Sequence, residues 1–191
     1  MIQTKVRIDG TTPLKMHSEK LANPLDSLTK KMKAITGKRK KTEDDQVAIM
    51  EIEFEAGMYF DEELGPFLPA KCLKAMIREA AKKTRAGINV SEALSILEFK
   101  VPLLYKGPRD VVGLWKANMY DVSSVCVGGK STVMRTRPMF FPWAAEFTIC
   151  YDESVINRDD LIAWLATAGT RTGFMDHRPE FGKFDLKVLE G

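Results

Sequence analysis

An α+β fold is predicted by three features of this 191-residue sequence. Segments in which apolar and polar residues alternate, typical of half-buried strands, lie at both ends and in the middle of the chain. Two segments with helix signals, at 65–85 and 157–168, separate them. The apolar share of 45% and the charged share of 29% are those of a globular domain long enough to bury a core.

The first half of the chain begins with a strand over residues 2–8, where apolar and charged side chains alternate. A basic insertion is expected over 19–46, because seven Lys or Arg residues fall between Lys30 and Lys41. We expect this insertion to be mobile, with one short helix over 24–35. The alternation of Met50, Ile52 and Phe54 with glutamates predicts the second strand.

The second half predicts a strand over 97–103 and then a long hairpin within 111–142, with Gly128 and Gly129 in a turn that requires positive φ. A strand over 145–149 follows. The next helix, 157–168, is expected to begin after an Asn157 cap and to stop at Gly169, and a last strand covers 184–188.

The resulting order is strand, helix, strand, repeated once. This is the split βαβ pattern of ferredoxin-like (RRM-like) folds, predicted as a single domain over 1–191 that carries the two insertions.

The first helix is apolar on one side and basic on the other. Its apolar side comprises Leu73, Met76, Ile77, Ala80 and Ala81. The opposite side comprises Lys71, Lys74, Arg78, Lys82 and Arg85. Like charges at i and i+4 repel one another, so this face is either solvated or tracks phosphates. The net charge of only +3 supplies no global argument for nucleic acid.

Three segments resemble the RAMP superfamily of CRISPR-associated proteins. The motif around the first helix is matched by Phe67, Leu68, Pro69, Lys71, Leu73, Lys74, Ala75, Ile77 and Arg78. The glycine-rich loop before the last strand is matched by Gly169, Gly173, Arg178, Phe181, Gly182 and Phe184. The first strand is followed by a similar "TPL" element at 12–14. The usual Ser-Ser before the helix lysine is replaced here by Ala70, Lys71 and Cys72.

The resemblance, which is strongest to single-domain backbone subunits that polymerise along guide RNA, implies a nucleic-acid-binding protein without a cofactor. It also suggests a stand-alone member, such as a phage or prophage protein. The helix start and the glycine-rich loop would hold single-stranded RNA, or DNA, by its phosphates. The expected contacts are Lys71, Lys74, Arg78, Lys82, Arg135, Arg137, Arg171, His177, Arg178 and Lys183. Phe140, Phe141 and Trp143 follow two of these arginines and are candidates for base stacking or for core packing.

Two other functional classes stay open. One is a metal-independent endoribonuclease, because some RAMP endoribonucleases use a loop histidine and this chain has two, His17 and His177. Asp26 lies where some backbone subunits carry a cleaving aspartate. The other class is an interaction protein that does not bind nucleic acid. A P-loop is disfavoured, since Ser124 stands where the "VGGKST" segment would need its first glycine.

The remaining expectations concern the environment and the assembly. Cys72, Cys126 and Cys150 form no close pair and are expected to be reduced thiols, in or near the core, of a cytoplasmic protein. No ligand cluster indicates a metal site. No segment approaches the ~20 apolar residues of a membrane span, and no signal peptide is expected at the start. One domain offers few phosphate contacts. We therefore predict a homo-oligomer, a filament or a ring, whose copies line up along the nucleic-acid strand.

Overall fold

The computed structural model describes residues 1–127 and 131–190 and has an α+β fold with antiparallel sheets, as the sequence predicted. The chain divides into two compact units, whereas the sequence predicted one domain with two insertions. Unit 1 comprises Met1–Leu14, Phe60–Lys106 and Phe140–Gly191, and unit 2 comprises Lys15–Tyr59 and Gly107–Met139. The expected insertion 19–46 lies within unit 2, as does almost all of the expected hairpin region 111–142.

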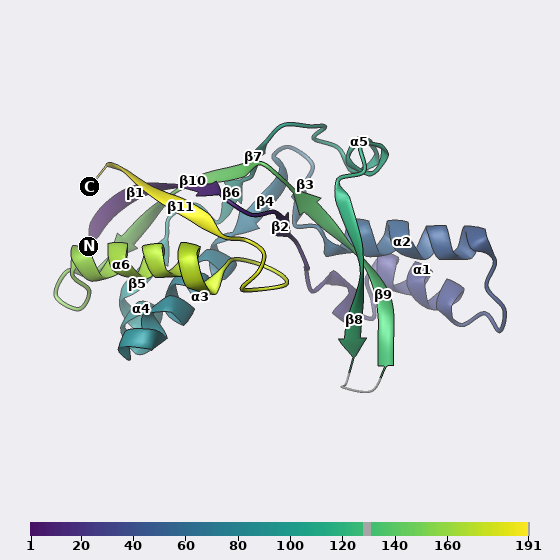
Figure 1. Ribbon diagram of the computed structural model, residues 1–191, viewed down its shortest axis with the longest axis horizontal. Coiled ribbons are helices and arrows are strands. Elements are labelled where there is room, and N and C mark those ends of the chain that lie inside the picture. The colour runs from purple at the N-terminus through teal and green to yellow at the C-terminus, as the bar shows by residue number, and fades with distance from the viewer. Residues whose placement is uncertain (128–130, 191) are drawn as a thin grey trace. The chain divides into compact units, whose positions relative to one another are not determined.

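The main sheet of unit 1 has the strand order β11-β1-β10-β5, and each neighbouring pair is antiparallel (Figure 1). Its strands are β1 (Ile2–Gly10), β5 (Leu94–Ile96), β10 (Trp143–Tyr151) and β11 (Phe184–Glu190), and the short β7 (Leu104–Tyr105) also pairs with β10. The register sets Val6 opposite Phe147, and both side chains are fully buried. The strands predicted over 2–8, 145–149 and 184–188 are therefore confirmed.

Helices α3 (Ala70–Ala81), α4 (Gly87–Ala93) and α6 (Arg158–Thr167) lie on one face of this sheet, and α3 contacts both of the others (Figure 1). The five apolar residues predicted for one side of α3 are those that it buries. The predicted Asn157 cap of α6 is also confirmed, because its side-chain oxygen accepts a hydrogen bond from the Asp160 N–H at 2.8 Å.

A second, small sheet of unit 1 has the order β3-β4-β6, formed by Phe60–Asp61, Gly65–Pro69 and Lys100–Pro102. The prediction of one strand over 97–103 is wrong, since β5 ends at Ile96 and β6 begins only at Lys100. Glu98 interrupts the strand because its carboxylate folds onto β10. It accepts hydrogen bonds from the Thr148 N–H at 2.8 Å and from the Thr148 hydroxyl at 2.9 Å.

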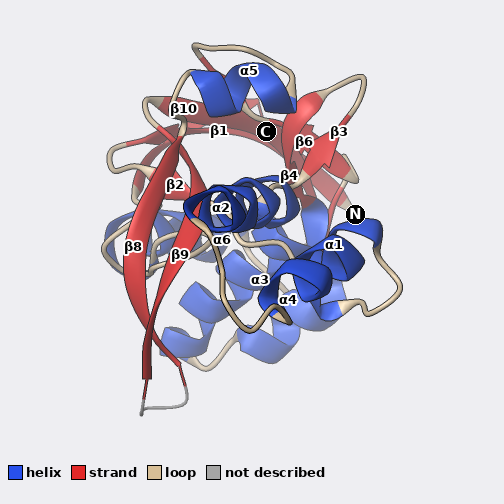
Figure 2. Ribbon diagram, turned by 90° about the vertical axis from the view of Figure 1, so that its right-hand side faces the viewer, coloured by secondary structure: helices blue, strands red, loops and turns tan. Residues whose placement is uncertain are grey.

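In its described part, unit 2 contains the helices α1, α2 and α5 and a long hairpin (Figure 2). The helices α1 (Ser27–Thr36) and α2 (Glu43–Gly57) pack through Leu28, Ile52 and Ala56, next to the 3-10 turn η1 (Lys20–Ala22). The helix expected over 24–35 is thus confirmed as α1. The short helix α5 (Val111–Lys116) precedes the hairpin, and its Trp115 ring stacks on Tyr120 with 4.4 Å between ring centroids.

The hairpin consists of β8 (Tyr120–Val127) and β9 (Ser131–Phe140), and β2 (Leu14–Lys15) pairs with β9. Its antiparallel register, with Val122 opposite Thr136, confirms the predicted hairpin. The predicted turn at Gly128 and Gly129 lies outside the described residues.

The strand predicted around Met50, Ile52 and Phe54 is wrong, because these residues belong to helix α2. A capping box starts this helix: the Thr42 hydroxyl accepts from the Asp45 N–H and the Asp45 carboxylate accepts from the Thr42 N–H. The alternation was misleading because Glu53, between the two apolar residues, is itself buried. Three consecutive buried residues are typical of a helix that packs on several sides. A strand with one solvent-exposed face would bury only alternate residues.

The end of α6 also differs from the prediction. Gly169 does not stop the helix, which continues through a π-helical turn, η3 (Ala168–Thr172), and ends at Gly173 with φ of +72°. Gly169 is needed for another reason, since a Cβ there would collide with the Phe184 carbonyl oxygen. Over the described part of the chain, none of the helices combines the length and the apolar character of a membrane span.

Candidate nucleic-acid interface

The basic face of α3 is exposed, as its amphipathic sequence requires. Lys71, Arg78 and Lys82 are exposed and Lys74 is half-buried. The Lys74 ammonium donates to the Ser91 carbonyl oxygen at 2.8 Å, and Lys82 pairs with the Glu79 carboxylate at 2.7 Å. Lys74 therefore ties α3 to the end of α4.

One end of this basic face lines a shallow groove of about 440 Å³ between α3 and α4. Arg78, Lys82 and Arg85 supply the charge, and Gly87, Ile88 and Ser91 supply the other wall. Arg85 has φ of +62° and ends the 3-10 turn η2 (Lys82–Thr84) that extends α3. The turn thus keeps Lys82 and Arg85 beside Arg78 of the helix.

The glycine-rich loop, residues 173–183, is closed at its base by glycines. Gly173 and Gly182 both have positive φ, and a Cβ on Gly182 would overlap the backbone of Phe174. The Gly182 N–H donates to the Pro13 carbonyl at 2.9 Å, and the Lys183 N–H donates to the Thr12 hydroxyl at 2.9 Å. The "TPL" element after β1 therefore anchors this loop.

The tip of the loop holds two non-glycine residues in the left-handed region, Met175 (φ +66°) and His177 (φ +57°). Such conformations cost free energy and persist only where the surroundings impose them. The His177 Nδ1 lies 3.6 Å from an Asp176 carboxylate oxygen, and its ring packs edge-on against Phe181. This tight fold presents the side chains at 175–179 together.

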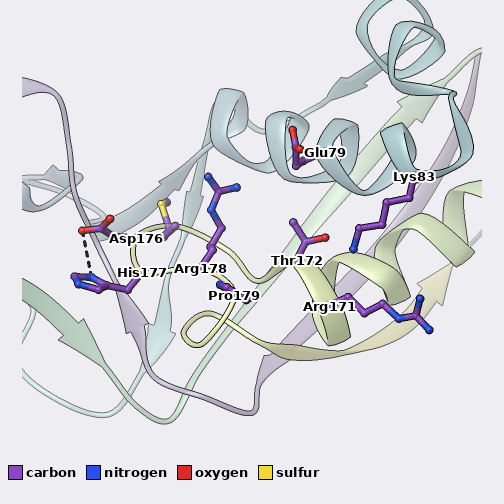
Figure 3. Close-up of a pocket in the computed structure, with 9 residues that line it drawn as sticks. Glu79, Lys83, Arg171, Thr172, Asp176, His177, Arg178 and Pro179 are labelled. Carbon is purple, nitrogen blue, oxygen red and sulfur yellow. Dashed lines mark ion pairs between the residues drawn. The ribbon is translucent and has the colours of Figure 1, made fainter. Parts of the chain in front are cut away.

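These side chains line an open pocket of about 580 Å³ with the end of α3, η2 and η3 (Figure 3). Its lining residues are Glu79, Lys83, Arg171, Thr172, Met175, Asp176, His177, Arg178 and Pro179. Figure 3 shows Lys83 reaching down from the helix side and Arg178 reaching up from the loop. Three permanent cations, Lys83, Arg171 and Arg178, thus face the pocket together with two carboxylates.

Lys83 was not among the predicted contacts, although its position carried a signal. It follows Glu79 by four residues, so the two side chains lie on one face of the helix end. The predicted helix start, with Lys71 and Lys74, does not line this pocket. The loop instead meets the C-terminal half of α3.

Glu79 lies among several cations. The Lys82 hydrogen bond lowers the pKa of its carboxyl group below the usual range, and the charges of Arg178 and Arg78 lower the pKa further. Glu79 is therefore ionised at neutral pH and reduces the positive potential of this surface.

The remaining predicted contacts lie elsewhere or are engaged. Lys183 is half-buried at the base of the loop. In unit 2, Arg135 pairs with Glu53 at 2.7 Å, and only 7% of Arg137 is exposed, so their role as phosphate contacts stays a prediction. Phe140 and Trp143 are buried, so core packing is the correct alternative for both, whereas Phe141 is 57% exposed.

The candidate catalytic residues belong to two different units. His177 lines the pocket of unit 1, and His17 is an exposed residue of unit 2. Asp26 is the N-cap of α1, where its carboxylate accepts from the Leu28 N–H at 2.8 Å. Among residues 1–127 and 131–190, no three acidic, histidine or cysteine side chains gather as a metal site.

Among the solved structures with a similar fold is a chain of an RNA-bound complex. It is a chain of the type III-B Cmr-beta complex bound to cognate target RNA, with a TM-score of 0.52 and 14% sequence identity. The match covers 98% of this chain but only 61% of the other, so this protein spans less than two thirds of its length. No protein-family model matches the sequence, and no curated protein matches it. At this identity the likeness shows a shared fold and nothing further.

Proposed function

We propose that this protein binds single-stranded nucleic acid, RNA or DNA, through its phosphate backbone, using the cationic surface of α3 and the 173–183 loop. The observation that carries the proposal is the gathering of Lys83, Arg171 and Arg178 around one open pocket. Lys and Arg groups that replace condensed counterions supply most of the affinity of non-specific binding. The binding should therefore depend strongly on salt and weakly on sequence.

The fold supports the same proposal. We assign unit 1 to the ferredoxin-like, RAMP-type class, and the antiparallel order β11-β1-β10-β5 with helices after β1 and β10 favours that assignment. The similar Cmr-beta chain belongs to an RNA-bound complex, which makes RNA the first ligand to test.

The test compares two triple variants with equal loss of charge. Lys83, Arg171 and Arg178 are changed to Gln in one, and Lys30, Lys31 and Lys33 of α1 are changed to Gln in the other. Fluorescence anisotropy with a labelled 20-nucleotide strand is measured at several salt concentrations. The first variant should bind more weakly on every sequence and lose roughly 0.7 units of log–log salt slope per lost phosphate contact. Equal binding by the parent and the folded first variant would overturn the proposal.

A second set tests the basic face of α3. Neutralising Lys71, Lys74 and Arg78 together should also weaken binding and flatten the salt dependence. If this variant folds and binds as the parent does, the face is only solvated.

A metal-independent endoribonuclease is the second candidate. The observation that favours it is that His177 lines the pocket beside Arg171 and Arg178, where a bound phosphodiester would meet an acid–base group. Labelled RNA is incubated with the protein in EDTA. We expect intact RNA, and cleavage that His177→Ala removes would make the protein an enzyme.

We further propose that copies of this protein assemble along the nucleic-acid strand. A single unit 1 offers a few cations, so one copy should bind weakly at physiological salt. Head-to-tail association would join these short surfaces into a continuous one.

A further inference from the structure

Phe99 is the most exposed large apolar side chain among the described residues, at 83%. It lies between β5 and β6, and Leu97, two residues earlier, is 60% exposed. Single exposed apolar residues are common on protein surfaces. The exposure of Phe99 is informative because of the way the backbone holds it and because of its neighbours.

The backbone around Phe99 is fixed by hydrogen bonds at three consecutive residues. The Leu97 N–H donates to the Thr148 carbonyl at 2.9 Å, and the Glu98 carboxylate accepts from Thr148. The Phe99 carbonyl accepts from the Ala70 N–H at 3.1 Å. Because Glu98 points back onto β10, the residues on either side of it are turned outward. The ring of Phe99 is therefore presented to solvent by an ordered segment.

The neighbours of Phe99 are cationic and aromatic. Ala70 is the first residue of α3, so the Phe99 carbonyl lies against the start of the basic helix, where Lys71 is exposed. Lys100, the next residue, is exposed, and its ammonium lies 5.3 Å from the centre of the Phe67 ring and also pairs with the Asp61 carboxylate. An exposed ring beside the start of a basic helix is an arrangement by which proteins hold single strands.

We propose that Phe99 is a stacking platform for a base of single-stranded nucleic acid. This inference rests on the proposed function. It adds a contact to the bases, which the phosphate contacts do not involve. Every base has a π face, so stacking on Phe99 preserves the sequence tolerance of the backbone contacts. A protein partner is disfavoured by the flanking lysines, because such residues are depleted from the centres of protein interfaces.

The experiment uses two strands of the same length, an oligothymidine and a strand of abasic nucleotides. Phe99→Ala should weaken binding of the oligothymidine by roughly 5-fold or more and leave binding of the abasic strand unchanged. Phe99→Tyr should retain the parent affinity and Phe99→Leu should not, since the aromatic face and not apolar area is required. Leu97→Ala is the matched control and should bind both strands as the parent does.

The outcomes separate this inference from the proposed function. If the parent binds neither strand, both proposals fail. If the parent binds and Phe99→Ala binds the oligothymidine equally well, only the stacking role fails. An equal loss on both strands, with circular dichroism unchanged, would also overturn stacking. A change in oligomer mass without nucleic acid in Phe99→Ala would assign the ring to a protein contact instead.

Discussion

The buried Glu53 carboxylate of α2 pairs with the Arg135 guanidinium of β9 at 2.7 Å. The Thr136 N–H donates to the second carboxylate oxygen at 2.9 Å, so both oxygens of a side chain that is 5% exposed are satisfied. This pair fixes α2 to the hairpin within unit 2. It also explains why Arg135, expected to contact phosphates, has a structural role.

Replacing Arg135 by Ala should destabilise the protein by about 2–4 kcal/mol, because a buried carboxylate then keeps only one donor. Urea unfolding followed by circular dichroism measures the change. The partner variant Glu53→Gln, which keeps a hydrogen-bond acceptor without the charge, should cost less. A loss under about 0.5 kcal/mol for Arg135→Ala would show that the pair is not important for stability.

The Asp61 carboxyl group should titrate at an unusually low pH. The hydrogen bond from Lys100, followed by those from the Leu64 and Glu63 N–H groups, lowers its pKa to about 2. Since the folded pKa lies below the ordinary aspartate value of 3.8, this contribution to stability is present above pH 3.8 and is lost as the pH falls through 2. In Lys100→Met, carbon NMR of the carboxyl group should show a higher pKa. An unchanged pKa would contradict the assigned cause.

Removing the charge of Glu79 should strengthen nucleic-acid binding. The lowered pKa keeps this carboxylate ionised at neutral pH beside Lys82, Arg78 and Arg178. Glu79→Gln should tighten single-strand binding by up to about fivefold at low salt, with a smaller effect at high salt. Its exposed pair with Lys82 contributes little to stability, so the fold should be retained. Glu92→Gln, an exposed glutamate of α4, is the control and should have a smaller effect.

Assembly should depend on the hairpin. Replacing 122–133 by a short turn is expected to abolish oligomers before it abolishes folding, because β8 and β9 extend from unit 2 as a long pair of strands (Figure 2). Mass photometry at micromolar and nanomolar concentration, with and without a long single strand, measures this. A parent protein that stays monomeric under all four conditions would contradict the assembly proposal.

The sequence by itself determined the elements whose signals are local. The apolar positions of α3 follow a helical period, so its buried and basic faces could be read directly. The Asn157 cap, the strands β1, β10 and β11 and the existence of the β8–β9 hairpin were also predicted from neighbouring residues only.

Only the tertiary structure decided the rest, because it depends on which side chains meet across the fold. The glutamates of α2 looked solvated until Arg135 and Thr136 provided partners for Glu53. Gly169 looked like a helix stop, whereas its role is to let Phe184 approach. Lys83 joined the candidate site, and Lys71 stayed outside the pocket, because the loop anchored by Pro13 packs against the C-terminal half of α3. Burial and pairing of charged groups depend on residues that are distant in sequence, so they cannot be predicted from local periodicity.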